Sequence, residues 1–192
     1  MIVILISGAP GSGKTTQAEK LSKHFGLMHV STGILLRNEI SSGSKLGKLA
    51  DKVISGGNFV SDEIACQMVK KVISSNLKLK GFIFDGFPRT LPQCHEFNNI
   101  LSGFNTEIKS FVNMKVPESE LTRRLQQRSS TSARIDDSNA KIIKHRFDLY
   151  NELADSINEY YKAKGVYSDV NGNLTVDLVF RKIISVLENK LI

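Results

Sequence analysis

The sequence predicts an α/β fold in which helices flank a parallel sheet. Apolar runs of strand length alternate along the chain with segments of helical periodicity. Residues 8–15 fit the pattern G-x-x-x-x-G-K-[ST] and lie between an apolar run at 1–6 and a helical pattern at 17–25, the context of a phosphate-binding loop, or P-loop. Another apolar run ends in Asp85. Because ligands of such sheets bind at the carboxyl ends of the strands, we expect Asp85 to lie beside that loop.

The segment that follows the first helix predicts a small lobe inserted into the core. A short apolar stretch at 27–30 predicts a second strand. Ser31 or Thr32 can cap the first of two short helices, and residues 45–54 predict the second. The block 31–60 has little apolar content of its own, so we expect a lobe inserted between core elements.

The remainder of the chain continues the alternation of strands and helices. A helix that begins at Ser61-Asp62 carries Ile64, Met68 and Val72 at four-residue spacing, which predicts a core-facing stripe. The polar run 129–132 predicts a flexible loop. The other expected elements are strands over 81–85, 108–116 and 166–170 and helices over 90–101, 118–127, 139–164 and 175–189.

The residue types of the loop at 8–15 suit the phosphates of a nucleotide. Glycines let successive N–H groups point inward, and the following helix presents its positive end to the same anion. Lys14 adds a full charge, and the Thr15 hydroxyl suits Mg²⁺ or a phosphate oxygen. A glycine-rich turn with a surface lysine is the alternative, but strand, spacing and helix occur together. We therefore expect a nucleoside triphosphate to contact Gly11, Ser12, Gly13, Lys14, Thr15 and Thr16.

Length and charge narrow the class of protein. A chain of 192 residues should form one domain with a substantial core, which we expect to comprise 1–30, 61–126 and 138–192. The net charge of +7 could indicate nucleic-acid or membrane binding. No long Lys/Arg run is present, and no apolar run approaches the roughly 20 residues of a membrane span. We therefore expect an anionic small substrate, with neither nucleic acid nor membrane as a partner.

The cysteine pattern and the absence of a heptad pattern give further expectations. Cys66 and Cys94 lie far apart and neither belongs to a C-x-x-C pair. We expect reduced thiols in a cytoplasmic protein and no zinc site. A monomer is the default expectation, since the sequence has no heptad repeat.

Three motifs resemble those of the adenylate kinase family. Residues 81–93 read Gly-Phe-Ile-Phe-Asp-Gly-Phe-Pro-Arg-Thr-Leu-Pro-Gln, which resembles the signature of that family. Residues 31–37, Ser-Thr-Gly-Ile-Leu-Leu-Arg, resemble its monophosphate-side motif, and residues 134–137 its lid motif. The resemblance covers essentially the whole chain in the correct order. It implies reversible transfer of the γ-phosphoryl group of ATP to AMP with Mg²⁺, an NMP-binding insert at 31–60 and a short lid at 127–137.

The resemblance also implies an active site dominated by arginines. Arg37 and Arg89 would clamp the AMP phosphate, Arg128 and Arg134 would approach the ATP phosphates with the lid, and Arg146 would bridge toward the transferring group. Guanidinium geometry suits such bidentate contacts. The residues that the resemblance assigns to catalysis are Lys14, Asp85, Arg89, Arg128, Arg134 and Arg146, with Mg²⁺ held through waters near Thr15 and Asp85.

The two bases would be bound in different ways. Gln93 and Thr32 would select the AMP base, since a carboxamide can both donate to and accept from an adenine edge. The ATP base would meet the loop near Gly172, largely through main chain. Arg124, one turn before Arg128, is a further candidate for ATP binding, although it could simply lie on the exposed face of its helix. The AMP set is Thr32, Arg37, Asn58, Phe59, Val60, Gly86, Arg89, Gln93, Arg134 and Arg146.

Other functions and assignments stay open at this point. The enzyme could be a kinase for UMP or CMP, a GTPase-like switch (although no N-K-x-D segment is present) or a binding protein that has lost turnover. The interval from Asp137 to Arg146 is one residue longer than in the family, so His145 is the alternative to Arg146. We expect Asp136 and Asp137 to orient the lid through ion pairs or a helix cap.

Ile34 stands where the family has an aspartate after Ser-Thr-Gly. The missing charge beside the AMP lobe is expected to have a modest effect on AMP binding. Replacing Ile34 by Asp should therefore change the KM for AMP, measured by steady-state kinetics at saturating ATP. An unchanged KM would contradict this expectation.

Overall fold

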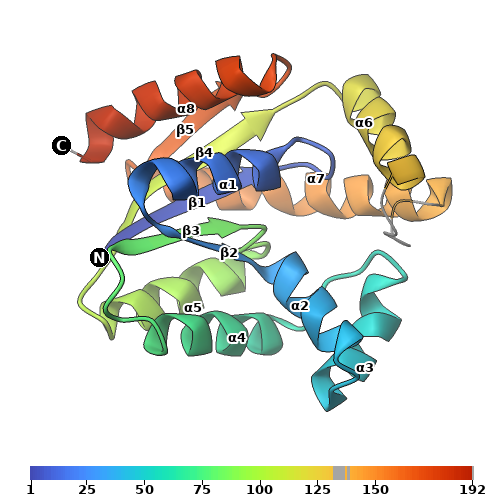
Figure 1. The fold of residues 1–192 in the computed structure, drawn as a ribbon, viewed down its shortest axis with the longest axis horizontal. Coiled ribbons are helices and arrows are strands. Elements are labelled where there is room, and N and C mark those ends of the chain that lie inside the picture. Colours follow the sequence, from blue (N-terminus) through green and yellow to red (C-terminus); the bar gives the residue numbers. More distant parts are fainter. Residues whose placement is uncertain (132–136, 138, 192) are drawn as a thin grey trace.

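The structure, a computed structural model, describes residues 1–131, 137 and 139–191. Figure 1 shows one parallel sheet with helices on both of its faces. The strand order is β2-β3-β1-β4-β5, and all neighbouring strands are parallel. The strands are β1 (Ile2–Gly8), β2 (Met28–Ser31), β3 (Gly81–Asp85), β4 (Ile108–Lys115) and β5 (Tyr167–Asn171). This arrangement confirms the predicted α/β fold class.

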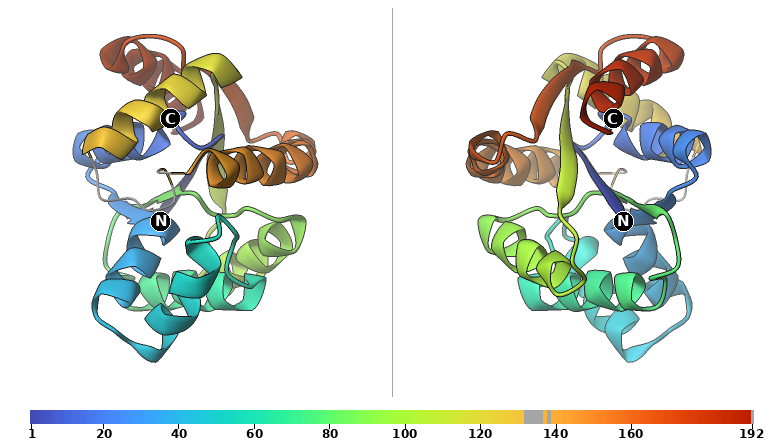
Figure 2. Two further views of the ribbon diagram at one scale, coloured as in Figure 1. Left: turned by 90° about the vertical axis from the view of Figure 1, so that its right-hand side faces the viewer. Right: turned by 90° about the vertical axis from the view of Figure 1, so that its left-hand side faces the viewer.

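One to three helices connect each strand to the next, and helices cover both faces of the sheet (Figure 2). The bounds are α1 (Lys14–Phe25), α2 (Thr32–Ser41), α3 (Lys45–Ile54), α4 (Asp62–Ser74), α5 (Leu91–Ser102), α6 (Glu118–Thr131), α7 (Ala140–Ala163) and α8 (Val176–Leu191).

The central strand β1 is buried on both faces, which explains its unbroken apolar run. Val3 and Leu5 belong to the cluster that includes α4, α5 and α7, whereas Ile4 and Ile6 belong to the cluster that includes α1 and α8. All four side chains are at most 1% exposed. Alternation along one strand therefore builds two cores, and the sheet separates them.

The register of the sheet brings three chain segments to one edge. Ile6 is paired with Asp85, and Asp85 is paired in turn with Ser31. The phosphate-binding loop follows β1, helix α2 follows β2, and the segment 86–90 follows β3. Residues distant in sequence are therefore neighbours at the carboxyl ends of the strands, as the sequence predicted for the loop and Asp85.

The block 31–60 contains two short helices that pack closely together, α2 and α3. Ser44 caps α3 by accepting a hydrogen bond from the Gly47 N–H at 2.9 Å. A Cβ added to Gly47 would lie 2.0 Å from the backbone oxygen of Glu39, so the two helix backbones leave no space for a side chain at this position.

Two sequence expectations about elements differ from the structure. Helix α1 begins at Lys14 rather than near residue 17, because Gly13, with a φ of 89°, leads directly from the loop into the helix. The prediction of a flexible loop over 129–132 is wrong for residues 129–131, which form the last residues of α6. The hydroxyls of Ser129 and Ser130 donate to the carbonyls of Gln126 and Gln127 at 2.7 Å, so these serines are accommodated within the helix.

Within the described part of the chain, every helix is too short or too polar to cross a bilayer.

The close approach at Gly47 gives a test of how the insert is built. Replacing Gly47 by Ala should lower the free energy of unfolding by about 1–3 kcal/mol, because backbone rather than a flexible side chain would have to move. The measurement is chemical denaturation followed by circular dichroism. Replacing the adjacent exposed Lys48 by Ala is the matched control and should change stability by less than about 0.5 kcal/mol. Equal stability of the two variants would contradict the argument.

Candidate active site

The phosphate-binding loop between β1 and α1 is packed so closely at Gly8 that it leaves no space for a side chain there. Gly8 has a φ of 149°, and a Cβ at this position would lie 2.7 Å from the Ser12 hydroxyl and 2.9 Å from the Met114 carbonyl oxygen. Helix α1 begins immediately after the loop, so its unpaired N–H groups and the positive end of its dipole face the same space. The loop is therefore suited to bind phosphate.

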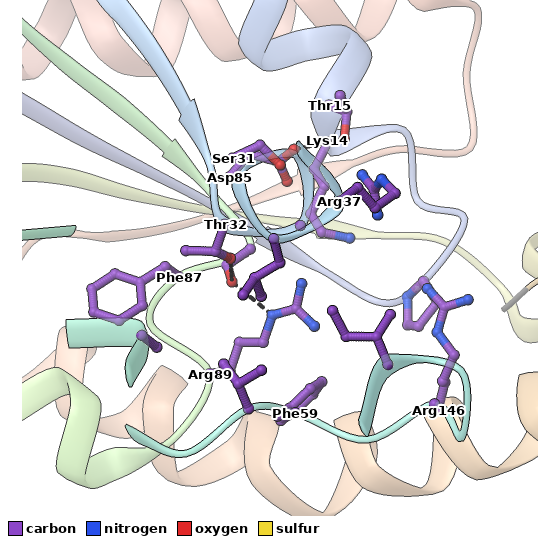
Figure 3. Close-up of a pocket in the computed structure, with 18 of the residues that line it drawn as sticks. Lys14, Thr15, Ser31, Thr32, Arg37, Phe59, Asp85, Phe87, Arg89 and Arg146 are labelled. Carbon is purple, nitrogen blue, oxygen red and sulfur yellow. Dashed lines mark hydrogen bonds between the residues drawn. The ribbon is translucent and has the colours of Figure 1, made fainter. Parts of the chain in front are cut away.

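Lys14 lies at the cationic centre of this site. Its Nζ donates to the Ala9 carbonyl at 3.3 Å. The pKa of Lys14 is lowered to about 8, chiefly by burial and also by the charges of Arg89, Arg146 and Arg128, against the opposing effect of Asp85. Figure 3 shows Lys14 and Arg89 directed toward each other from opposite sides of the cavity. Such a concentration of positive charge favours a polyanionic ligand.

Asp85 and Thr15 form a close pair of oxygen groups beside Lys14. The Thr15 hydroxyl donates to Asp85 Oδ2 at 2.6 Å, and His29 Nε2 lies 3.7 Å from the same oxygen. Burial would raise the pKa of Asp85, but contact with His29, the charge of Lys14 and the Thr15 hydrogen bond bring it to about 2. An ionised carboxylate and a hydroxyl are hard oxygen donors of the kind that Mg²⁺ prefers, so these residues fit that ion.

Asp137 joins two of the arginines that the sequence assigned to catalysis. Arg128 donates to its two carboxylate oxygens at 2.6 and 2.8 Å, and Arg146 donates at 2.7 Å. Asp137 is 2% exposed, and although burial raises its pKa, the two guanidinium groups hold that pKa below its ordinary value. The ion pairs expected of Asp137 are therefore present, and they link α6 with α7.

Arg89 is held in place by its own loop and by the insert. Its Nε donates to the Gly86 carbonyl at 2.6 Å, and its guanidinium carbon lies 4.6 Å from the centroid of the Phe59 ring. The Thr32 hydroxyl donates to the same Gly86 carbonyl at 2.9 Å. These contacts connect the segment after β3 with the start of α2 and with the end of the insert, so the two sides of the cavity meet at Arg89.

Part of the cavity wall is apolar, and the cavity is also lined by the buried carboxamide of Gln93. Gln93 is 2% exposed, and Phe87 and Val60 are buried beside it in the cavity wall. Asn58, which also lines the cavity, has its Oδ1 2.8 Å from Nε2 of His145 on α7. Apolar walls around a few fixed polar groups are typical of a site for a nucleotide base.

Arg124 connects the loop with the chain that follows β5. Its guanidinium donates to the Ser12 carbonyl at 3.4 Å and to the Gly172 carbonyl at 3.2 Å, while Glu120 accepts from its Nε at 2.7 Å. The sequence left open whether Arg124 is merely an exposed helix residue. The structure places it across the phosphate-binding loop instead.

Most of the residues selected from the sequence line a single cavity. Those that line it are Gly11, Lys14, Thr15, Thr32, Arg37, Asn58, Phe59, Val60, Asp85, Gly86, Arg89, Gln93, Arg128 and Arg146. Arg134 and Asp136 lie outside the described residues. Of the two candidates on α7, Arg146 lines the cavity and His145 is exposed.

Sequence reasoning missed two residues that contact this set. His29 lies against Asp85, and Asp62 contacts Gln93. Neither belongs to a local motif, because each is brought to its partner only by the packing of the sheet and of helices α4 and α5.

The fold, the loop and the converging arginines define a phosphate-loop protein that acts on nucleotides. The family model described as adenylate kinase matches residues 6–166, and the chain belongs to that family. It is 39% identical over 189 residues to an adenylate kinase of Parabacteroides distasonis, with 98% of this chain and 99% of the relative covered. It is 42% identical over 183 residues to an adenylate kinase of Bacteroides fragilis, with 95% and 96% covered.

Membership of this family confirms the resemblance noted in the sequence and establishes the activity. The chain is a phosphotransferase that catalyses the reversible reaction of ATP and AMP to two ADP. Adenylate kinases in general use MgATP, and ATP and AMP or ADP are the substrates that the family implies.

The lowered pKa of Lys14 predicts how ATP use depends on pH. In the free enzyme Lys14 loses its charge as the pH rises through about 8, so kcat/KM for ATP should fall above that pH. The value of kcat at saturating ATP should fall less, because bound phosphate favours the charged lysine. Initial rates from about pH 7 to 10 at constant free Mg²⁺ test this. A kcat/KM that stays level across the range would contradict the prediction.

The same shift predicts a change in stability. Between about 8 and 10.5, the unfolded chain keeps a proton on Lys14 that the folded protein has released, so the contribution of this residue to stability rises with pH. Replacing Lys14 by Met should remove that rise in a denaturation series over the same pH range. A variant with the pH dependence of the parent protein would exclude Lys14 as its source.

Proposed function

We propose that phosphoryl transfer proceeds in line within the cavity, with MgATP along the phosphate-binding loop and AMP between the insert and Gln93. The observation that carries this proposal is that Lys14, Arg89 and Gln93 line one cavity, in which Lys14 and Arg89 point toward each other (Figure 3). In this proposal the core comprises 1–30, 61–126 and 138–192, the NMP-binding insert 31–60, and the short lid 127–137.

Catalysis by this site would rest on positioning and on charge. Phosphoryl transfer gives a protein little covalent work, because the barrier is lowered chiefly by alignment of the reactants and neutralisation of the oxygens. Lys14 and Arg128 would bind the ATP phosphates, while Arg37 and Arg89 would bind the AMP phosphate. Arg146 would contact the group in transfer, since it extends from α7 and lines the same cavity as Lys14 and Arg89.

Asp137 supports this proposal by holding two of the arginines together. Without a counter-ion, Arg128 and Arg146 would repel each other in a partly buried site. The carboxylate of Asp137 contacts both, so their guanidinium groups are positioned before any substrate arrives.

Thr15 and Asp85 would hold the magnesium ion of MgATP through waters. The ion supplies charge neutralisation at the phosphate oxygens. The residues themselves contribute an ionised buried carboxylate and a hydroxyl within 2.6 Å of each other.

Binding of substrate would be accompanied by closure of the insert and the lid, which excludes water as a competing acceptor. The contact between Asn58 and His145 is relevant to such closure, because it shows that the insert can reach α7.

We also propose a monomeric, cytoplasmic enzyme. Both free cysteines are buried, and burial raises the pKa of Cys66 to about 11 and of Cys94 to about 12, so neither readily forms the reactive thiolate.

The arrangement of the AMP site is tested by offering AMP, CMP, UMP and GMP separately with MgATP. AMP should be strongly preferred, and replacing Arg37 by Lys should raise the KM for AMP about tenfold, because a lysine cannot make bidentate contacts to phosphate. The KM for ATP should stay nearly unchanged.

The control for that variant is Arg181→Lys, which makes the same exchange at an exposed position on α8. It should leave both KM values unchanged. A normal KM for AMP in Arg37→Lys would contradict the assignment of Arg37, and a better rate with a pyrimidine nucleotide would contradict the base site.

A further inference from the structure

The carboxamide of Gln93 is held from two sides by different elements of the fold. Its Oε1 accepts a hydrogen bond from the backbone N–H of Arg89 at 2.7 Å. Its Nε2 donates to Oδ1 of Asp62 at 2.7 Å. Arg89 belongs to the segment after β3, and Asp62 is the first residue of α4. The side chain is 2% exposed, so water does not compete strongly for these bonds.

These two partners fix the orientation of the carboxamide. A backbone N–H can only donate, and an ionised carboxylate can only accept. If the Gln93 amide turned over, its NH₂ would face the N–H of Arg89 and its oxygen would face the carboxylate of Asp62. Both bonds would become repulsive contacts at a buried position, where unsatisfied polar groups are costly.

The remaining hydrogen-bonding capacity of Gln93 is therefore defined. The NH₂ group has two hydrogens and the oxygen has two acceptor sites, and one of each is engaged. One donor and one acceptor remain on the same amide. Adenine presents an acceptor at N1 and a donor at its 6-amino group, whereas hypoxanthine presents the reverse, a donor at N1 and an acceptor at O6.

We infer that Asp62 is a specificity-determining positioning residue, which keeps the Gln93 amide in the orientation that accepts adenine and rejects a base with the reversed pattern. This inference rests on the proposed function, in which Gln93 faces the base of AMP. Asp62 contacts Gln93 and not the substrate.

The fixed starts of the two helices support this role for Asp62. Ser61 caps α4 by accepting a bond from the N–H of Ile64 at 3.4 Å, and Thr90 caps α5 by accepting one from the N–H of Gln93 at 3.2 Å. Asp62 and Gln93 are therefore each within the first turn of a capped helix, where the backbone has little freedom.

The competing explanation is that Asp62 only stabilises the start of α4, as acidic residues do at helix N-termini. Glu63 supplies the matched comparison. It is an exposed acidic residue in the same first turn, and its carboxylate accepts a bond from Gln67 at 3.1 Å. Replacing Glu63 by Gln removes the same charge from the same helix end without touching Gln93.

The experiment compares AMP with inosine monophosphate as acceptors, using MgATP and the variants Asp62→Asn, Asp62→Ala and Glu63→Gln. For Asp62→Asn, the ratio of kcat/KM for AMP to that for inosine monophosphate should fall about tenfold, because an asparagine can pair with either orientation of the Gln93 amide. The change should lie mainly in the KM values of the acceptors, and the KM for ATP should stay unchanged. Glu63→Gln should keep the parent ratio.

Three results would overturn the inference. The first is that Asp62→Asn folds, as judged by its melting curve, and keeps the same ratio of kcat/KM for AMP to that for inosine monophosphate as the unchanged enzyme. The second is that this ratio falls equally in Asp62→Asn and in Glu63→Gln. If Asp62→Asn does not fold, Asp62→Ala decides in the same way. The third is a parent ratio in Gln93→Ala, which would show that Gln93 does not read the base and would overturn the proposed AMP site as well. If the ratio changes in Gln93→Ala but not in Asp62→Asn, the proposed AMP site stands and only the role of Asp62 is contradicted.

Discussion

The structure depends on holding several positive charges together in one partly buried cavity. Lys14 and a group of arginines face one cavity, and their mutual repulsion contributes to the low pKa of Lys14. Two buried carboxylates offset this repulsion. Asp85 lies at the end of β3 beside Lys14, and Asp137 holds Arg128 and Arg146. The remaining positive charge is the part of the site that an anionic substrate neutralises.

The parallel sheet makes this concentration of charge possible. The loops that follow β1 and β3 begin from strands that are buried on both faces, so their positions are set by the core rather than by the loops themselves. The register that pairs Ile6 with Asp85 and Asp85 with Ser31 determines which side chains can meet. Polar chemistry at the rim is therefore positioned by apolar packing in the interior.

Local sequence predicted the features that local physics controls. The phosphate-binding loop, the strand that ends in Asp85 and helix α3 were each apparent from spacing and residue type. The bridge from Arg124 to Gly172 and the contact between Asp62 and Gln93 were not, because their partners are 48 and 31 residues apart and meet only after the sheet has formed. The serine run after Arg128 was misjudged for a different reason, since hydroxyls that favour loops also bond to the preceding helical turn.

Arg89 contributes to the cavity through two chemically independent parts. Its backbone N–H bonds to Gln93, and its guanidinium lies over Phe59. Any residue except proline has a backbone N–H that can bond to Gln93, whereas only arginine has a guanidinium group to place over Phe59. Substitution at this position can therefore alter one contact and leave the other in place. In evolutionary terms the two properties are separable, so a descendant of this enzyme could lose affinity for one part of its substrate without first losing its preference for the other.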